Sequence, residues 1–507
     1  MIDDHGGEKS MPTPYILAID QGTTSTRALV YDSTSRQLGS AARELRQHYP
    51  QPGWVEHDAD EIWESVAAVV PAALAAAKIE PKELAAIGLT NQRETSVLWE
   101  RTTGKPVGRA IVWQDRRTAD FCRQHQADEA WISARTGLVL DPYFSATKVG
   151  WQLANDLRLR TQAEAGHLAW GTIDSFLIWR LTGGRVHATD ATNASRTLLL
   201  NLQSTAWDED LCRYFGVPRA LLAEVRPSAA DYGVTSGLGF LPDGLPIAGV
   251  AGDQQAALFG QRGFAAGDAK CTYGTGAFFL QHVGDRPIAS KHRLLCTVAA
   301  TLDARPQYAL EGSVFIAGAA VQWLRDGLKL FDSAPAVENL AACSDSNQRV
   351  LFVPALVGLG APHWVPEARG VLFGITRGTT AAELARAALE GVAYQVADLV
   401  EAAGKDAATA LASLRVDGGM ARNAWFLQRQ ADILGLPVLQ SAHSESTALG
   451  AALLAGLKTG VWPDLDSLRR LPHEGQEFKP GSSQQERQSR LLEWRRAVQA
   501  VIAFYHK

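Results

Sequence analysis

Several features that mark common protein classes are absent from this sequence of 507 residues. Its five cysteines include no Cys-x-x-Cys pair, which argues against a disulfide framework and a zinc site and favours a reducing cytoplasm. The 49 basic residues do not outnumber the 54 acidic ones, so charge gives no case for binding nucleic acid or an anionic membrane. The longest apolar stretch, residues 66–77, is too short to span a bilayer. Residues 1–12 lack the basic start and apolar core of a signal peptide, and we expect them to form a disordered extension.

The chain also lacks the phosphate-binding motifs of two large classes of nucleotide enzyme. It contains neither the Walker-type Gly-x-x-x-x-Gly-Lys-Ser/Thr loop nor the His-Arg-Asp and Asp-Phe-Gly motifs of protein kinases. A nucleotide enzyme with this sequence would therefore have a different architecture.

The most informative motif that is present is Asp-Gln-Gly-Thr-Thr-Ser-Thr-Arg at residues 20–27, between apolar runs at residues 15–19 and 28–31. The pattern predicts a β-hairpin whose turn offers backbone N–H groups and the hydroxyls of Thr23, Thr24 and Ser25 to a phosphate. Asp20 would repel a phosphate, so we expect it to hold a divalent cation through water. An ordinary polar hairpin turn is the alternative.

A second strand, Gly/Thr turn and strand follow about half a chain later, at residues 269–280, with the turn Tyr-Gly-Thr-Gly at residues 273–276. Two related hairpins that face each other across a cleft could hold a polyphosphate from both sides. Strands that alternate with amphipathic helices elsewhere in the chain predict an α/β protein. The Gly-containing stretch at residues 261–268 is the best domain boundary, which gives domains at residues 13–262 and 263–507.

Helix signals in the sequence include a capping pattern and an amphipathic run. Thr380 with Glu383 predicts a helix start and a helix that runs to residue 404. A second helix is predicted over about residues 483–505, and its apolar side chains should dock on the protein body. These side chains are Leu491, Leu492, Trp494, Val498 and Ile502.

Three polar motifs follow predicted strands, where open α/β sheets place their ligands. In Gly-Asp-Gln-Gln at residues 252–255, Asp253 could accept a proton from a substrate hydroxyl or could simply cap a helix. Residues 91–95, Asn-Gln-Arg-Glu-Thr, would cost about 1–3 kcal/mol each if buried unpaired. A small polyhydroxy ligand would satisfy them, and pairing of Arg93 and Glu94 with other side chains is the alternative. The Asp-Gly-Gly at residues 417–419 permits close approach of a ring or a sugar, or forms a tight turn.

Taken together, these motifs resemble the glycerol kinases of the carbohydrate kinase family. The resemblance runs in order from about Tyr15 to Trp462 and also includes residues 53–58, 113–114 and 141–145. It implies two actin-like (ribonuclease H-like) domains, each with a central mixed sheet flanked by helices, and an active site in the interdomain cleft. The implied reaction is transfer of the γ-phosphoryl group of ATP to glycerol with Mg²⁺.

The resemblance also assigns roles to individual residues. Asp253 is the implied base, and Asp20 is the residue implied for magnesium. The implied substrate-binding residues are Arg93, Glu94, Trp113, Tyr143, Asp253, Gln254 and Phe278, with Trp113 and Phe278 forming an apolar wall. The implied nucleotide-binding residues are Thr23, Thr24, Ser25, Arg27, Thr275, Gly318, Gln322, Gly419 and Asn423.

Departures from the family pattern concern regulation. Residues 233–244 contain no Lys, Arg or His, which puts in doubt the sugar bisphosphate and phosphohistidine control that some relatives have near this loop. Relatives also lead us to expect a homo-oligomer, either a dimer or a tetramer.

Two rival interpretations remain. The first is a kinase of another small polyol or ketose on the same fold, against which Arg93, Glu94 and Trp113 argue, because a longer substrate needs their space. The second is an ATPase of the actin or heat-shock class without an acceptor, which has no use for the polar cluster at residues 91–95.

Overall fold

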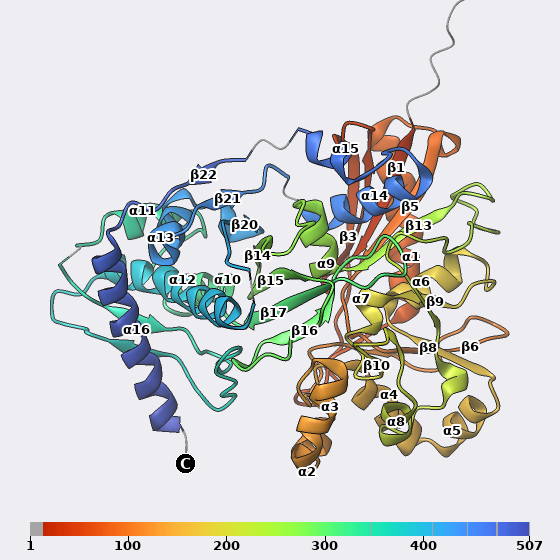
Figure 1. The fold of residues 1–507 in the computed structure, drawn as a ribbon, viewed down its shortest axis with the longest axis horizontal. Helices are drawn as coiled ribbons and strands as arrows, with labels where there is room; N and C mark the ends of the chain where they lie inside the picture. Colours follow the sequence, from red (N-terminus) through yellow and green to blue (C-terminus); the bar gives the residue numbers. More distant parts are fainter. Residues whose placement is uncertain (1–13, 346, 408, 444, 473–474, 506–507) are drawn as a thin grey trace, which may run out of the picture.

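The computed structural model describes residues 14–345, 347–407, 409–443, 445–472 and 475–505, so the predicted extension at residues 1–12 lies outside the described residues. Two mixed β-sheets, each with helices against it, form the two halves of the molecule (Figure 1). All five cysteines are free, and four of them are buried. No helix in the described part of the chain is both long and apolar enough to cross a membrane.

The first sheet has the strand order β13-β5-β1-β2-β3. Its hairpin β1–β2 is antiparallel, whereas β5 and β13 continue the sheet in parallel to β1. Apolar runs build β1, β5 and β13, which are buried on both faces of the sheet, whereas the edge strand β3 is polar and mostly exposed. The strands are β1 (Tyr15–Gln21), β2 (Ser25–Tyr31), β3 (Gln37–Glu44), β5 (Leu84–Asn91) and β13 (Ile247–Gly252).

The second sheet, with the order β16-β17-β15-β14-β20-β21-β22, repeats this plan. Its hairpin β14–β15 is antiparallel, and β20 and β21 extend the sheet in parallel to β14. The predicted duplication of a mixed sheet is therefore confirmed. The strands are β14 (Ala269–Tyr273), β15 (Ala277–Gly284), β16 (Leu295–Val298), β17 (Tyr308–Val314), β20 (Leu414–Asp417), β21 (Val438–Gln440) and β22 (Glu477–Phe478).

Helices cover both sheets. In the first half these include α1 (Ala59–Ala77), α6 (Ile173–Leu181) and α9 (Asp253–Gly260), and in the second α12 (Ala381–Asp406) and α13 (Ala424–Leu434). The last helix, α16 (Gln484–Tyr505), packs against α13. The capping box of Thr380 and Glu383 at the start of α12 is present as predicted. Trp494 and Val498 of α16 are buried, but the expectation that Leu492 docks is wrong, because it is 59% exposed.

Helix α14 (Ser446–Thr459) comes from the C-terminal part of the chain but packs on the first sheet, beside β1, β5 and β13 (Figure 1). Close backbone approach makes this possible: a Cβ atom on Gly450 would overlap the carbonyl oxygen of Ala256, and one on Gly88 would overlap that of Ala451. The two halves of the molecule are therefore joined by a crossing helix as well as by the chain between β13 and β14. The domain bounds at residues 262 and 263 stay a prediction.

A smaller helical lobe beside the first sheet carries part of the site. It contains α2 (Ala119–Gln124), α3 (Glu129–Thr136), α4 (Ser145–Asn155), α5 (Leu157–Glu164) and α8 (Glu209–Tyr214) around a core of its own. Helix α4 begins directly after residues 141–144, so this core fixes the segment that holds Tyr143.

Candidate active site

The three parallel strands of the first sheet end at one level. Gln21 of β1 pairs with Asn91 of β5, which also pairs with Gly252 of β13. The hairpin turn after Gln21, the polar cluster after Asn91 and the acid after Gly252 are therefore neighbours at one edge of the sheet. This placement brings three of the sequence motifs into one site.

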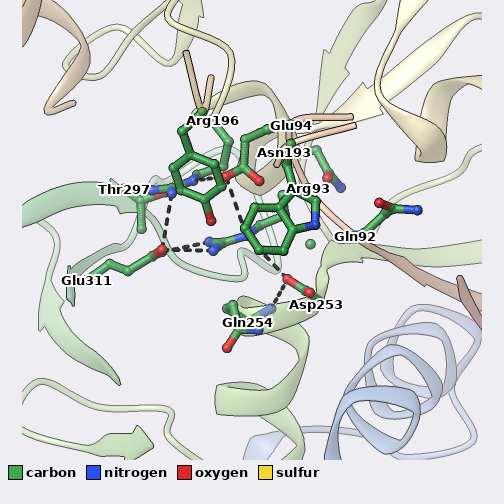
Figure 2. A network of polar contacts seen from close by, with 12 residues as sticks. Gln92, Arg93, Glu94, Asn193, Arg196, Asp253, Gln254, Thr297 and Glu311 are labelled. Atoms are coloured by element: carbon green, nitrogen blue, oxygen red, sulfur yellow. Dashed lines mark hydrogen bonds and ion pairs between the residues drawn. The ribbon is translucent and has the colours of Figure 1, made fainter. Parts of the chain in front are cut away.

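Asp253 is the first residue of α9 and points into this site (Figure 2). Its side chain is 31% exposed, and its Oδ1 lies 3.3 Å from Nε of Arg93 and accepts a hydrogen bond from the backbone N–H of Gln254. Burial raises the pKa of Asp253 above its usual value, although Arg93 and Lys270 oppose this effect. Asp253 thus combines access to the site with an increased affinity for a proton, which are the properties of a general base.

Arg93 and Glu94 lie in a buried cluster of charges (Figure 2). Arg93 donates to both carboxylate oxygens of Glu311, at 2.6 and 2.8 Å, and to Oε1 of Gln255 at 3.1 Å. Glu94 accepts from Nε of Arg196 at 2.6 Å. Both side chains are therefore paired with other side chains, the alternative that the sequence left open, and their role as substrate ligands stays a prediction.

The rest of the polar cluster after β5 also pairs internally. Asn91 exchanges two amide hydrogen bonds with Asn193. Gln92 donates to Oε1 of Gln21 at 3.1 Å and accepts from Thr95 at 2.9 Å. These residues need no ligand to satisfy them and instead hold β5 and β1 in register at the edge of the site.

Glu311, Arg196 and Lys270 are site residues that the motifs do not predict. Lys270 of β14 is fully buried and donates to the side chain of Gln254, and to Thr272 Oγ1 at 2.9 Å. A sequence signal exists for Glu311, because it is a lone acid within the apolar strand Tyr308–Val314. Lys270, by contrast, looks like any strand residue that alternates towards solvent.

Aromatic side chains form one side of the site. Trp113 and Tyr143 pack edge to face, with ring centroids 5.5 Å apart. Lys148 Nζ holds the segment of Tyr143 by donating to the carbonyl oxygens of Pro142, Tyr143 and Phe144. Phe278 of β15 makes no ring contact with another aromatic side chain in the described ranges, so its place in an apolar wall stays a prediction.

The first hairpin turn faces the same site. Trp113 Nε1 donates to Thr23 Oγ1 at 2.9 Å, so the proton of this hydroxyl is free to point elsewhere. The side chain of Arg27, on β2, pairs with that of Glu445 at 2.6 Å. Burial raises the pKa of Asp20 to about 7; Arg27 opposes the increase, and Glu445 and Asp253 add to it.

The second hairpin turn borders a pocket of about 390 Å³. Gly418 has φ of 91° and lies against the backbone of Tyr273, so glycine is required where β20 ends beside β14. The pocket contains every residue that was predicted for the nucleotide in this half, namely Thr275, Gly318, Gln322, Gly419 and Asn423. A Cβ atom on Gly419 would meet only open space, so this glycine leaves the pocket wall open to a ligand.

The donor set for a metal ion is small. In the ranges that the structure describes, no three His, Cys, Asp or Glu side chains are grouped as metal ligands. Asp20 offers one carboxylate whose pKa is raised by burial, with Glu445 and Asp253 adding to the increase. One or two carboxylates with water and phosphate oxygens are the ligands that Mg²⁺ usually takes, so Asp20 fits such an ion.

Comparisons with known proteins agree over nearly the whole chain. The N-terminal domain of the FGGY family of carbohydrate kinases matches residues 15–260, and its C-terminal domain matches residues 269–459. Glycerol kinases of Deinococcus radiodurans and Rhizobium rhizogenes are 54% and 53% identical, each over 96% of this chain and over 97% and 99% of their own lengths. The crystal structure of Plasmodium falciparum glycerol kinase with ADP covers 96% of this chain and 98% of its own, with 35% identity and a TM-score of 0.91. The chain belongs to the FGGY family of carbohydrate kinases.

Proposed function

We propose that the protein phosphorylates glycerol with ATP and Mg²⁺, giving sn-glycerol 3-phosphate and ADP. The observation that carries this proposal is the position of Asp253, a half-buried carboxylate with a raised pKa at the same sheet edge as the hydroxyl-rich hairpin turn. The names of the relatives that are more than 50% identical favour glycerol over other acceptors.

In the proposed reaction Asp253 takes the proton of a terminal hydroxyl as its oxygen attacks the γ-phosphorus. The breaking P–O bond leaves its electrons on the β-phosphate of ADP. Arg93, Glu94, Tyr143 and Gln254 would orient the three hydroxyls of glycerol, and Trp113 with Phe278 would contact its carbon atoms. The protein thus acts mainly by positioning the reactants, as is general for phosphoryl transfer.

The two hairpins would divide the nucleotide between them. Thr23, Thr24, Ser25, Arg27 and Thr275 would bind phosphates, and Gly318, Gln322, Gly419 and Asn423 would line the nucleoside pocket. Asp20 would hold Mg²⁺ through water, and the ion would supply positive charge that stabilises the negative charge of the phosphates.

Water can attack the same phosphorus, so an acceptor kinase needs to exclude it. Closure of the two halves when the acceptor binds would complete the site and remove bulk water. The site supports this idea because the residues that line it come from both halves: Asp253 and Arg93 come from the first, and Thr275 and Gly419 from the second.

The test is ADP release from MgATP without an acceptor and then with glycerol, xylulose, ribulose and erythritol in parallel. We expect a rate near zero alone and a strong increase with glycerol only. Activity with a longer polyol but not with glycerol would favour a kinase of another acceptor, and steady turnover without any acceptor would favour an ATPase.

The raised pKa of Asp20 predicts a pH dependence of nucleotide binding. Below about pH 7 this carboxyl, which faces Arg27, Glu445 and Asp253, gains a proton and loses the charge that attracts a cation. We expect kcat/KM for MgATP to fall by up to about tenfold per pH unit as the pH decreases below this value. Because ATP also titrates in this range, Asp20→Asn is the matched control, and an identical pH profile in the variant would contradict the prediction.

Trp113 joins the acceptor side of the site to the phosphate hairpin through its hydrogen bond to Thr23. Trp113→Phe keeps an apolar ring but removes the indole N–H that orients the Thr23 hydroxyl. We expect kcat to fall by about tenfold, while KM for glycerol changes less, because a hydrogen bond near the phosphates contributes about 1 kcal/mol or more. Thr23→Val should give a similar loss, and the double variant should lose little more. Additive losses would show that the two residues act independently.

A dimeric or tetrameric state and a cytoplasmic location stay predictions.

A further inference from the structure

Glu311 joins the two halves of the molecule at the floor of the site. It lies on β17 of the second sheet and is fully buried, yet its carboxylate pairs with Arg93 at the end of β5 in the first half. Its Oε1 also lies 3.1 Å from Nη2 of Arg196, another residue of the first half. The pair Arg93–Glu311 thus connects the two halves through residues that are 218 positions apart in the chain.

The cluster around Glu311 is balanced in charge. Two guanidinium groups, Arg93 and Arg196, face two carboxylates, Glu94 and Glu311 (Figure 2). Burial acts to raise the pKa of Glu311, but Arg196 and Arg93 outweigh it and hold that pKa at about 2. Glu311 is therefore charged throughout the working pH range, and loss of its charge would leave an unmatched arginine in the interior.

The pairing also determines how Arg93 is oriented. Both terminal nitrogens of its guanidinium are bonded to Glu311, and Nη1 also donates to Gln255. The remaining nitrogen, Nε, is left 3.3 Å from Asp253 Oδ1 and 3.8 Å from Glu94 Oε1. A planar guanidinium held at two points has little freedom to rotate.

We propose that Glu311 is a positioning residue that fixes Arg93, so that its Nε faces Asp253 and the acceptor is held against the base. Glu311 acts through Arg93 and does not itself touch the substrate. On β15, Leu280 pairs with Glu311, so the strand that leaves the second hairpin turn is bonded to the strand that orients Arg93. The orientation of Arg93 in the acceptor site thus depends on a residue from the half of the molecule that carries the nucleoside pocket. This inference rests on the proposed function of Asp253 and Arg93.

The test is the kinetics of Glu311→Gln, which keeps the shape of the side chain and removes its charge. We expect KM for glycerol to rise about tenfold or more, while KM for MgATP changes less than about twofold, because the acceptor site loses its order and the nucleotide site does not. Glu401→Gln is the matched control, because it also removes a glutamate that pairs with an arginine, Arg495, but at the surface. This control should keep both KM values.

The result that overturns the proposal is a rise in KM for glycerol below about threefold, or an equal rise in both KM values, which would indicate a merely structural role. If Glu311→Gln does not fold, the same measurement is made on Glu311→Asp, which keeps the charge but withdraws it from Arg93. We expect Glu311→Asp to fold and still show the raised KM for glycerol. Wild-type protein in the same assay separates the two ideas, since absence of glycerol-dependent turnover there would reject the proposed function itself.

Discussion

Asp253→Asn is expected to lower kcat by about 10² to 10⁴-fold and to leave MgATP binding intact. Asparagine has the same shape as aspartate and can keep the contact with the backbone N–H of Gln254, but it cannot accept the proton of a hydroxyl. The nucleoside pocket lies in the other half of the molecule and is not touched by the change. Turnover with saturating glycerol and a thermal shift with ADP measure the two effects separately.

The same substitution should not reduce stability, which distinguishes a catalytic group from a structural one. Burial raises the pKa of Asp253 in the folded state, so its charged form is disfavoured there relative to the unfolded chain. This cost is present above the folded-state pKa and disappears as the pH falls through it. At pH 8 we therefore expect Asp253→Asn to have the same melting temperature as the wild type or a higher one.

The matched control for Asp253→Asn is Asp303→Asn, a change of the same kind at a surface residue that pairs with Arg305. It should retain full turnover. Turnover of Asp253→Asn above about a tenth of the wild-type value would remove Asp253 from the role of base.

The central strands of the first sheet could be predicted from the sequence because β1, β5 and β13 are mainly apolar runs, each followed by a polar motif. Parallel strands end at one edge of a sheet, so Gln21, Asn91 and Gly252 bring their motifs together once the strand order is known. The two Gly/Thr turns could be predicted because the same pattern of strand, turn and strand occurs twice in the sequence. Most residues of the candidate site therefore lie in motifs at the ends of strands, where the sequence can identify them.

What the sequence did not predict depends on contacts between residues far apart in the chain. Glu311 and Arg196 have no motif of their own, and only the packing of the two sheets places them against Arg93 and Glu94. The position of α14 on the first sheet was missed for a related reason. Its apolar and small residues fit either half equally well, and the choice is made by the close fit of Gly450 to Ala256 and of Gly88 to Ala451.

Lys148 is a further residue that sequence reasoning passes over, because a lone lysine in a helix normally faces solvent. Here it is fully buried, and burial lowers its pKa to about 7 even though Glu94, Asp115 and Asp141 oppose the shift. Hydrogen bonds offset the cost of burying this ammonium group, because its Nζ atom donates to three consecutive carbonyl oxygens, those of Pro142, Tyr143 and Phe144. These carbonyls precede α4 and fold the segment into a tight loop that presents the ring of Tyr143 to Trp113.

Lys148→Met should therefore reduce both stability and acceptor affinity. Methionine fills a similar volume but removes the side-chain donor from the carbonyl groups of Pro142 and Tyr143, while that of Phe144 still accepts from Thr147 Oγ1, so we expect the free energy of unfolding to fall by about 3 kcal/mol. The loop would then lose its shape and Tyr143 would move away from Trp113, which should raise KM for glycerol more than KM for MgATP. Chemical denaturation and steady-state kinetics test the two parts, with Lys405→Met on the surface of α12 as the matched control. Unchanged stability would show that water replaces the ammonium group at these carbonyls, and unchanged KM for glycerol would show that the loop does not depend on Lys148 to place Tyr143.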